Sequence, residues 1–191
     1  MARLPGSTSE STIANVLSVN SNGTNLVSSS SGTVKGKVSL GSTMFDAPGT
    51  SQFGIYNLAC FTTNASAKYM TTDWVTSTAL ARDFKNQIYI PTGKVYSFNI
   101  TANANIADDA AGTTYATQSA TFVVSGLVQQ LSSSGACEII GNPKSSIKSS
   151  GNLSTVGFSV LCETKILALQ VTGLATKAIR WSAVATINET G

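Results

Sequence analysis

Apolar and polar residues alternate along residues 166–187, in two runs that a short polar turn separates. This alternation is typical of β-strands buried on one face, because successive side chains of a strand point to opposite sides. The apolar positions are Leu167, Leu169 and Val171 in the first run and Ile179, Trp181, Ala183, Ala185 and Ile187 in the second. The two runs predict a terminal β-hairpin with Trp181 as its main anchor, while the adjacent Arg180 points to the opposite face.

The same period recurs through most of the chain. Residues 53–63 are apolar on both faces, which indicates a central strand or an interface with another subunit. Residues 87–90 are expected to pair with residues 94–106 around a Pro-Thr-Gly turn, and residues 94–106 to pair with residues 115–130 in a long hairpin. Shorter strands at residues 137–140 and 156–162 bring the total to about eight to ten. We therefore expect an all-β fold, an antiparallel β-sandwich of jelly-roll type.

The first 32 residues differ in composition from the rest, with Ser, Thr, Asn and Gly dominant. Such a segment buries too little apolar surface to fold alone. We expect residues 1–32 to form an extended arm and residues 33–191 to form the sandwich. The arm is expected to dock on a neighbouring subunit, the alternative being an arm folded back on its own domain. Its apolar residues, the candidate contacts, are Ile13, Val16, Leu17, Leu26 and Val27.

Only 11% of the residues are charged, with 12 Lys and Arg against 9 Asp and Glu. A shortage of charge removes the repulsion that keeps copies of a protein apart, so we expect a homo-oligomer, with a trimer favoured. The net charge of +3 is small and scattered, and the closest basic pair is Lys35 and Lys37. Nucleic acid is therefore not expected as a partner.

The chain has no histidine, and its three cysteines show no CxxC spacing. This pattern fits neither a complete disulfide framework nor a zinc site, and we expect Cys60, Cys137 and Cys162 to be buried thiols. Asp108 and Asp109 are adjacent carboxylates in a Gly-containing stretch and are expected to belong to a turn. With no histidine as a general base, we expect no catalytic residue, no metal and no cofactor, and hence no enzyme.

No run of residues has the length of a signal peptide's apolar core or of a membrane span, so neither secretion by the standard route nor a membrane partner is expected. Residues 73–85 are predicted to contain one short helical turn or a paired strand. The aromatic residues Tyr69 and Trp74 lie where the alternation is more irregular and are the candidate contacts for a glycan.

Two segments carry a resemblance to a known family: IYIPTGKVYSFNITANA at residues 88–104 and ALQVTGLATKAIRWSAVATI at residues 168–187. Together with the long return strand between them, they resemble a β-sandwich module of tailed bacteriophage structural proteins, including those of cyanophages. The resemblance implies a non-enzymatic virion component that is made in the host cytoplasm.

Two functions are compatible with this resemblance. The first is an oligomeric subunit that decorates or cements the capsid, clamping virion proteins such as the major capsid protein with its arm. The alternative is the receptor-binding module of a tail or head fibre, in which loops at residues 63–85 or 141–152 contact host surface glycan.

Overall fold

The computed structural model describes residues 37–44, 47–72, 86–107, 115–132, 135–149 and 151–190. Within these ranges the chain forms ten β-strands and one short 3-10 helix, η1 (Gly151–Thr155), and no α-helix. The prediction of an all-β, antiparallel fold is confirmed. The arm at residues 1–32, the predicted helical turn at residues 73–85 and the Asp108–Asp109 turn lie outside the described residues.

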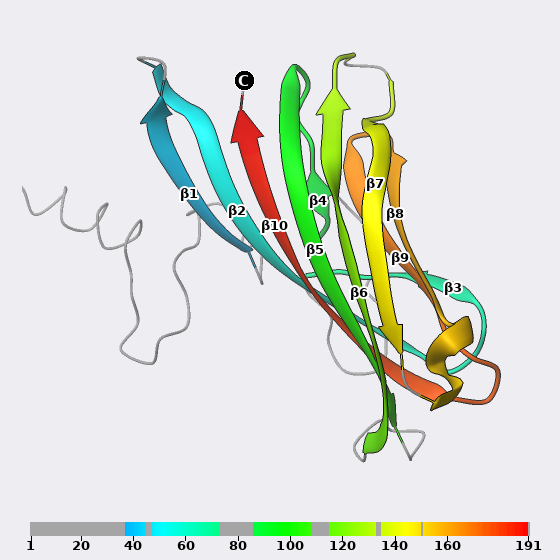
Figure 1. The fold of residues 1–191 in the computed structure, drawn as a ribbon. Helices are drawn as coiled ribbons and strands as arrows, with labels where there is room; N and C mark the ends of the chain where they lie inside the picture. Colours follow the sequence, from blue (N-terminus) through cyan, green and yellow to red (C-terminus); the bar gives the residue numbers. More distant parts are fainter. Residues whose placement is uncertain are drawn as a thin grey trace, which may run out of the picture.

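Six strands form the larger sheet, in which every neighbouring pair is antiparallel (Figure 1). Their order across the sheet is β1 (Lys37–Met44), β2 (Ala47–Thr62), β10 (Ala178–Thr190), β5 (Lys94–Ala107), β6 (Tyr115–Gln130) and β7 (Glu138–Ser149). The predicted long hairpin is β5–β6. The strand that is apolar on both faces is β2, which lies between β1 and β10 and is therefore an inner strand, the first of the two predicted alternatives.

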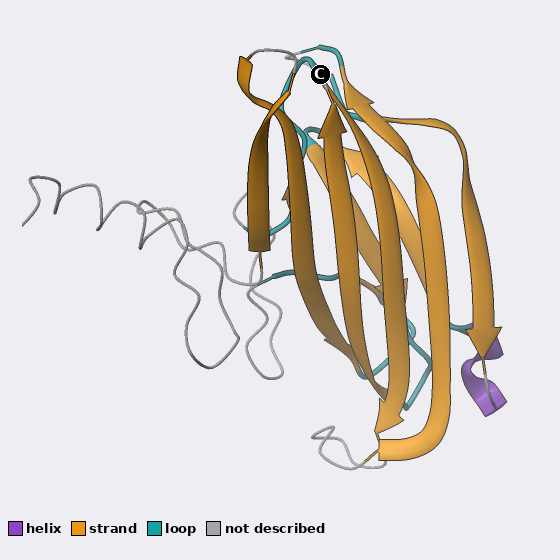
Figure 2. Cartoon of the chain, turned by 60° about the vertical axis from the view of Figure 1, so that its left-hand side comes forward, coloured by secondary structure: helices purple, strands orange, loops and turns teal. Residues whose placement is uncertain are grey.

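The smaller sheet is built around β9 (Ile166–Thr172). On one side β9 pairs along its whole length with β8 (Gly157–Glu163), and on the other with β3 (Ala67–Tyr69) and β4 (Ile88–Tyr89). The two sheets pack as the layers of a sandwich, and η1 follows the end of β7 (Figure 2).

Two predicted strand pairings are wrong, although the strands themselves are present. Residues 166–172 and 178–187 do not form a hairpin, because β9 belongs to the smaller sheet and β10 to the larger one. Likewise β4 pairs with β9 and not with β5. The alternating pattern shows only that one face of each strand is buried in the core. Two strands that pair in one sheet and two strands that face each other from opposite sheets both give this pattern. β10 instead pairs along its length with β2 and β5, which are long enough to bond its whole backbone.

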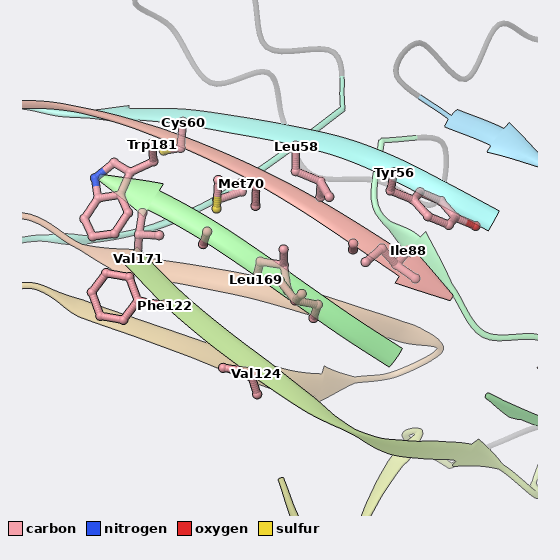
Figure 3. Packing of buried hydrophobic residues seen from close by; sticks show 14 of the residues in the cluster. Tyr56, Leu58, Cys60, Met70, Ile88, Phe122, Val124, Leu169, Val171 and Trp181 are labelled. Atoms are coloured by element: carbon pink, nitrogen blue, oxygen red, sulfur yellow. The ribbon is translucent and has the colours of Figure 1, made fainter. Parts of the chain in front are cut away.

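The core lies between the two layers and takes its side chains from the expected faces. The inward residues of β9 and β10 are all at most 3% exposed: Leu167, Leu169, Val171, Ile179, Trp181, Ala183, Ala185 and Ile187. At one end of the core, Trp181 lies with Phe122 and Val171, and at the other Tyr56 lies near Ile88 (Figure 3). The indole N–H of Trp181 donates a hydrogen bond to Oγ1 of Thr62 at 3.0 Å, and its ring centroid is 6.0 Å from that of Phe122.

Candidate functional site

A trough lies on the outward face of the larger sheet, over β2, β10 and β5. It has a volume of about 320 Å³. The residues that line it are Asn57, Leu58, Ala59, Thr71, Thr72, Asn103, Ser182, Ala183 and Val184. Because the strands alternate, the side chains of Asn57, Ser182 and Asn103 point away from the core at this place.

The trough is built on a row of residues that the strand register places side by side. Ser182 lies opposite Ala59 on one side and opposite Asn103 on the other. Thr71 continues the row beyond Ala59, and Thr121 continues it beyond Asn103. Neighbours in such a row have Cβ atoms about 5 Å apart, so the polar side chains of the row are close enough to contact one ligand together.

Backbone hydrogen bonds hold one wall of the trough in place. The N–H and carbonyl of Thr71 bond to the carbonyl and N–H of Ala59 at 3.0 and 2.9 Å. The preceding residue, Met70, donates to the carbonyl of Leu169 in the smaller sheet at 2.9 Å. The segment therefore ties the two layers together at the trough, which makes this wall part of the rigid sandwich.

The side-chain chemistry of the trough is neutral. Thr121 donates its hydroxyl proton to Oδ1 of Asn103 at 2.8 Å, which holds that amide in one orientation. The buried hydroxyl oxygens of Thr71 and Thr72 have no hydrogen-bond partner within the described structure. Beside these polar groups, the apolar residue Val184 is 47% exposed. The described lining therefore combines amide and hydroxyl groups with an apolar surface, and it contains no titratable side chain.

This combination suits a neutral sugar ring, which has hydroxyl groups around its edge and C–H groups on its faces. Amides and hydroxyls both donate and accept hydrogen bonds, so they match sugar hydroxyls without the desolvation cost of burying a charge.

Of the predicted site residues, Tyr69 is the one within the described part of the chain, and it does not line this trough. Tyr69 lies in the smaller sheet, opposite Gln170, and its hydroxyl donates to Oε1 of Glu163 at 2.5 Å. Trp74 and the five arm residues lie outside the described residues. Of the two predicted contact loops, residues 63–66 form an exposed bend, but residues 141–149 belong to strand β7 and are not a loop.

The cysteines have the form that the sequence predicts: Cys60 and Cys137 are buried free thiols, and Cys162 is a partly buried one. Burial raises the pKa of the Cys60 thiol. Among the described residues, no cluster of His, Cys, Asp or Glu is arranged to hold a metal ion. No helix in this part of the chain has the length and hydropathy of a membrane span.

No protein-family model and no curated protein matches the chain. Among solved structures, it is similar to the tailspike protein gp49 of Acinetobacter baumannii bacteriophage Fri1, described as a capsular polysaccharide depolymerase. This match has a TM-score of 0.31 and 8% identity, and covers 78% of this chain and 19% of that one. The chain is also similar to the tailspike protein of Acinetobacter phage vB_ApiP_P1, with a TM-score of 0.34 and 14% identity over 71% of this chain and 22% of that one.

The chain thus spans about a fifth of the length of each tailspike. One sequence-based expectation is corrected here. Gp49 is described as an enzyme, so the assignment of this chain as non-enzymatic is withdrawn. TM-scores this low do not assign the activity of gp49 to this chain either.

Proposed function

We propose that this chain is a bacteriophage virion protein that binds host surface glycan through the trough on β2, β10 and β5. The observation that supports this proposal is the neutral amide and hydroxyl lining around Asn57, Asn103 and Ser182, set beside the exposed Val184. The resemblance of residues 88–104 and 168–187 to tailed-phage β-sandwich modules supports the virion assignment. A receptor-binding role is therefore favoured over the capsid role.

A titration of the full-length protein with purified capsular or lipopolysaccharide glycans of the host tests this proposal. The change to make is the double substitution Asn57→Ala and Asn103→Ala, which removes two amides from the trough. Each hydrogen bond is worth about 0.5–1.5 kcal/mol, so the double variant is expected to bind roughly tenfold more weakly.

The matched control is Asn142→Ala, which removes an exposed amide from β7, outside the trough. This variant is expected to bind as the unsubstituted protein does. Equal affinities of all three proteins, or no glycan binding by any of them, would contradict the proposal. Measuring released reducing ends in the same samples separates binding alone from cleavage of the polysaccharide.

A second candidate function is an oligomeric subunit that decorates the capsid, and a different observation favours it. Leu127 on β6 and Ile140 on β7 lie opposite each other in register, and their exposed fractions are 42% and 38%. Neighbouring exposed apolar side chains favour contact with another protein. Antibody labelling of intact particles tests this candidate, since a decoration protein labels the whole capsid and a receptor-binding protein labels only the tail or fibres.

A further inference from the structure

Two of the three cysteines lie together inside the sandwich, where the segment before β7 meets the β8–β9 hairpin. Cys137 is 4% exposed and belongs to the core cluster. Cys162 pairs with the buried Leu167 and packs against the same cluster from β8. Cys60 lies on a different element, β2.

Hydrogen bonds fix Cys137 against the hairpin turn that follows Cys162. The backbone N–H of Cys137 donates to the carbonyl oxygen of Thr164 at 2.5 Å. Its sulfur lies 3.3 Å from the carbonyl oxygen of Ile166 and donates to it. Cys162 lies on the first strand of the same hairpin, two residues before Thr164, and packs against the same core cluster as Cys137. The fold therefore brings the two cysteines to the same end of the β8–β9 hairpin.

The two thiols also differ chemically. The hydrogen bond from Cys162 lowers the pKa of Cys137. The same hydrogen bond, together with burial, raises the pKa of Cys162. The two thiols therefore differ in thiolate fraction, and the thiolate is the form that reacts with an oxidant. A neighbouring thiol resolves the oxidised product to a disulfide.

We propose that Cys137 and Cys162 form an intrachain disulfide bond when the protein meets a peroxide. The thiolate of one of the two cysteines attacks one oxygen of hydrogen peroxide, the O–O bond breaks, and hydroxide leaves and takes up a proton to become water. The other cysteine then attacks the sulfur of the resulting sulfenic acid, the S–O bond breaks, and a second water leaves. Two thiols and one peroxide thus give one disulfide and two waters, and two electrons pass from sulfur to oxygen.

The bond would connect the two layers of the sandwich. It would join the segment that leads into β7, at the edge of the larger sheet, to β8 in the smaller sheet, and the two strands lie next to each other (Figure 1). A cross-link between residues 137 and 162 also restricts the unfolded chain, which raises stability. The oxidised protein is therefore expected to resist unfolding better than the reduced protein.

The test treats the reduced full-length protein with equimolar hydrogen peroxide and counts thiols after denaturation. The count is expected to fall from the three thiols of the reduced chain to one. Trypsin is expected to release a linked pair of peptides, ending at Lys144 and Lys165, that a reductant separates. The unfolding temperature is expected to rise by about 5–10 °C on oxidation and to return on reduction.

Cys60→Ser is the matched control, because it removes the cysteine outside the pair; it is expected to keep the linked peptides and the rise in unfolding temperature. Cys162→Ala is expected to abolish both. Three remaining thiols, loss of Cys60 at the same rate as the pair, a link between two chains, or sulfinic acid without a link would each overturn the proposal. These readouts on the unsubstituted protein decide the matter even if a cysteine variant does not fold.

Discussion

At the residue scale, Trp181 shows how one position can serve both packing and a buried polar group. Its side chain is 2% exposed and fills the core beside Phe122, while its N–H bonds to Thr62. Arg180, next to it in the chain, lies on the outward side of β10 and is half-buried, as the alternation predicts.

Replacing Trp181 with Ala is expected to lower the free energy of unfolding by about 3–5 kcal/mol, because the substitution leaves a cavity and also leaves the Thr62 hydroxyl without its donor. Denaturant unfolding followed by circular dichroism measures this loss. Ser182→Ala, at the next and exposed position of β10, is the control and is expected to change stability by less than about 0.5 kcal/mol. Similar unfolding midpoints for the two variants would show that the anchoring role of Trp181 is wrong.

At the element scale, the connection between β9 and β10 determines the architecture. The chain leaves the smaller sheet at Thr172 and enters the larger one at Ala178, and Gly173 begins the crossing. A Cβ atom at Gly173 would lie 2.4 Å from Oγ1 of Thr62 and 2.6 Å from the carbonyl oxygen of Asn64. The crossing thus needs a glycine because it passes directly against the end of β2.

Gly173→Ala is expected to destabilise the protein by about 1–3 kcal/mol, because the added methyl group must displace Thr62, the hydrogen-bond partner of Trp181. Thermal unfolding and the fluorescence of Trp181 measure the effect. Gly135→Ala is the control, since a Cβ atom there would meet its nearest neighbour at an ordinary 3.6 Å. An unchanged stability of the Gly173 variant would mean that the crossing is looser than described.

The local pattern predicts which residues form strands, which faces are buried and the long β5–β6 hairpin, but it does not predict the partners of β4, β9 and β10. For the segments at residues 166–172 and 178–187, alternation is equally satisfied by a hairpin and by two opposed layers. The trough is hidden from the sequence for the same reason: Asn57, Asn103 and Ser182 are distant in the chain, and only the pairing of β10 with β2 and β5 brings them together. The signal that the sequence does carry is the run of uncharged polar residues at the outward positions of β5.

At the scale of the whole molecule, the larger sheet ends at β1 on one side and at β7 on the other. Residues 1–36 precede β1, whereas exposed apolar residues such as Ile147, at 64%, occur on β7. If the arm docks on the β7 edge of a neighbouring copy, as we propose, the contact is head-to-tail, and it gives a closed ring such as a trimer when the rotation between copies closes.

Deletion of residues 2–30 is therefore expected to leave strand content and cooperative unfolding intact, because the described sandwich begins at Lys37, but to weaken the oligomer. Light scattering at micromolar concentration is expected to show trimers for the full chain and monomers for the truncated chain, and the truncated chain is expected not to enter virus particles. Replacing Ile13, Val16 and Leu17 by Ser in the full chain is the matched variant, since it keeps the length of the arm and removes its apolar contacts. A truncated protein that still forms trimers would exclude the arm as the link between subunits, and one that fails to fold would place the arm within the core of its own domain.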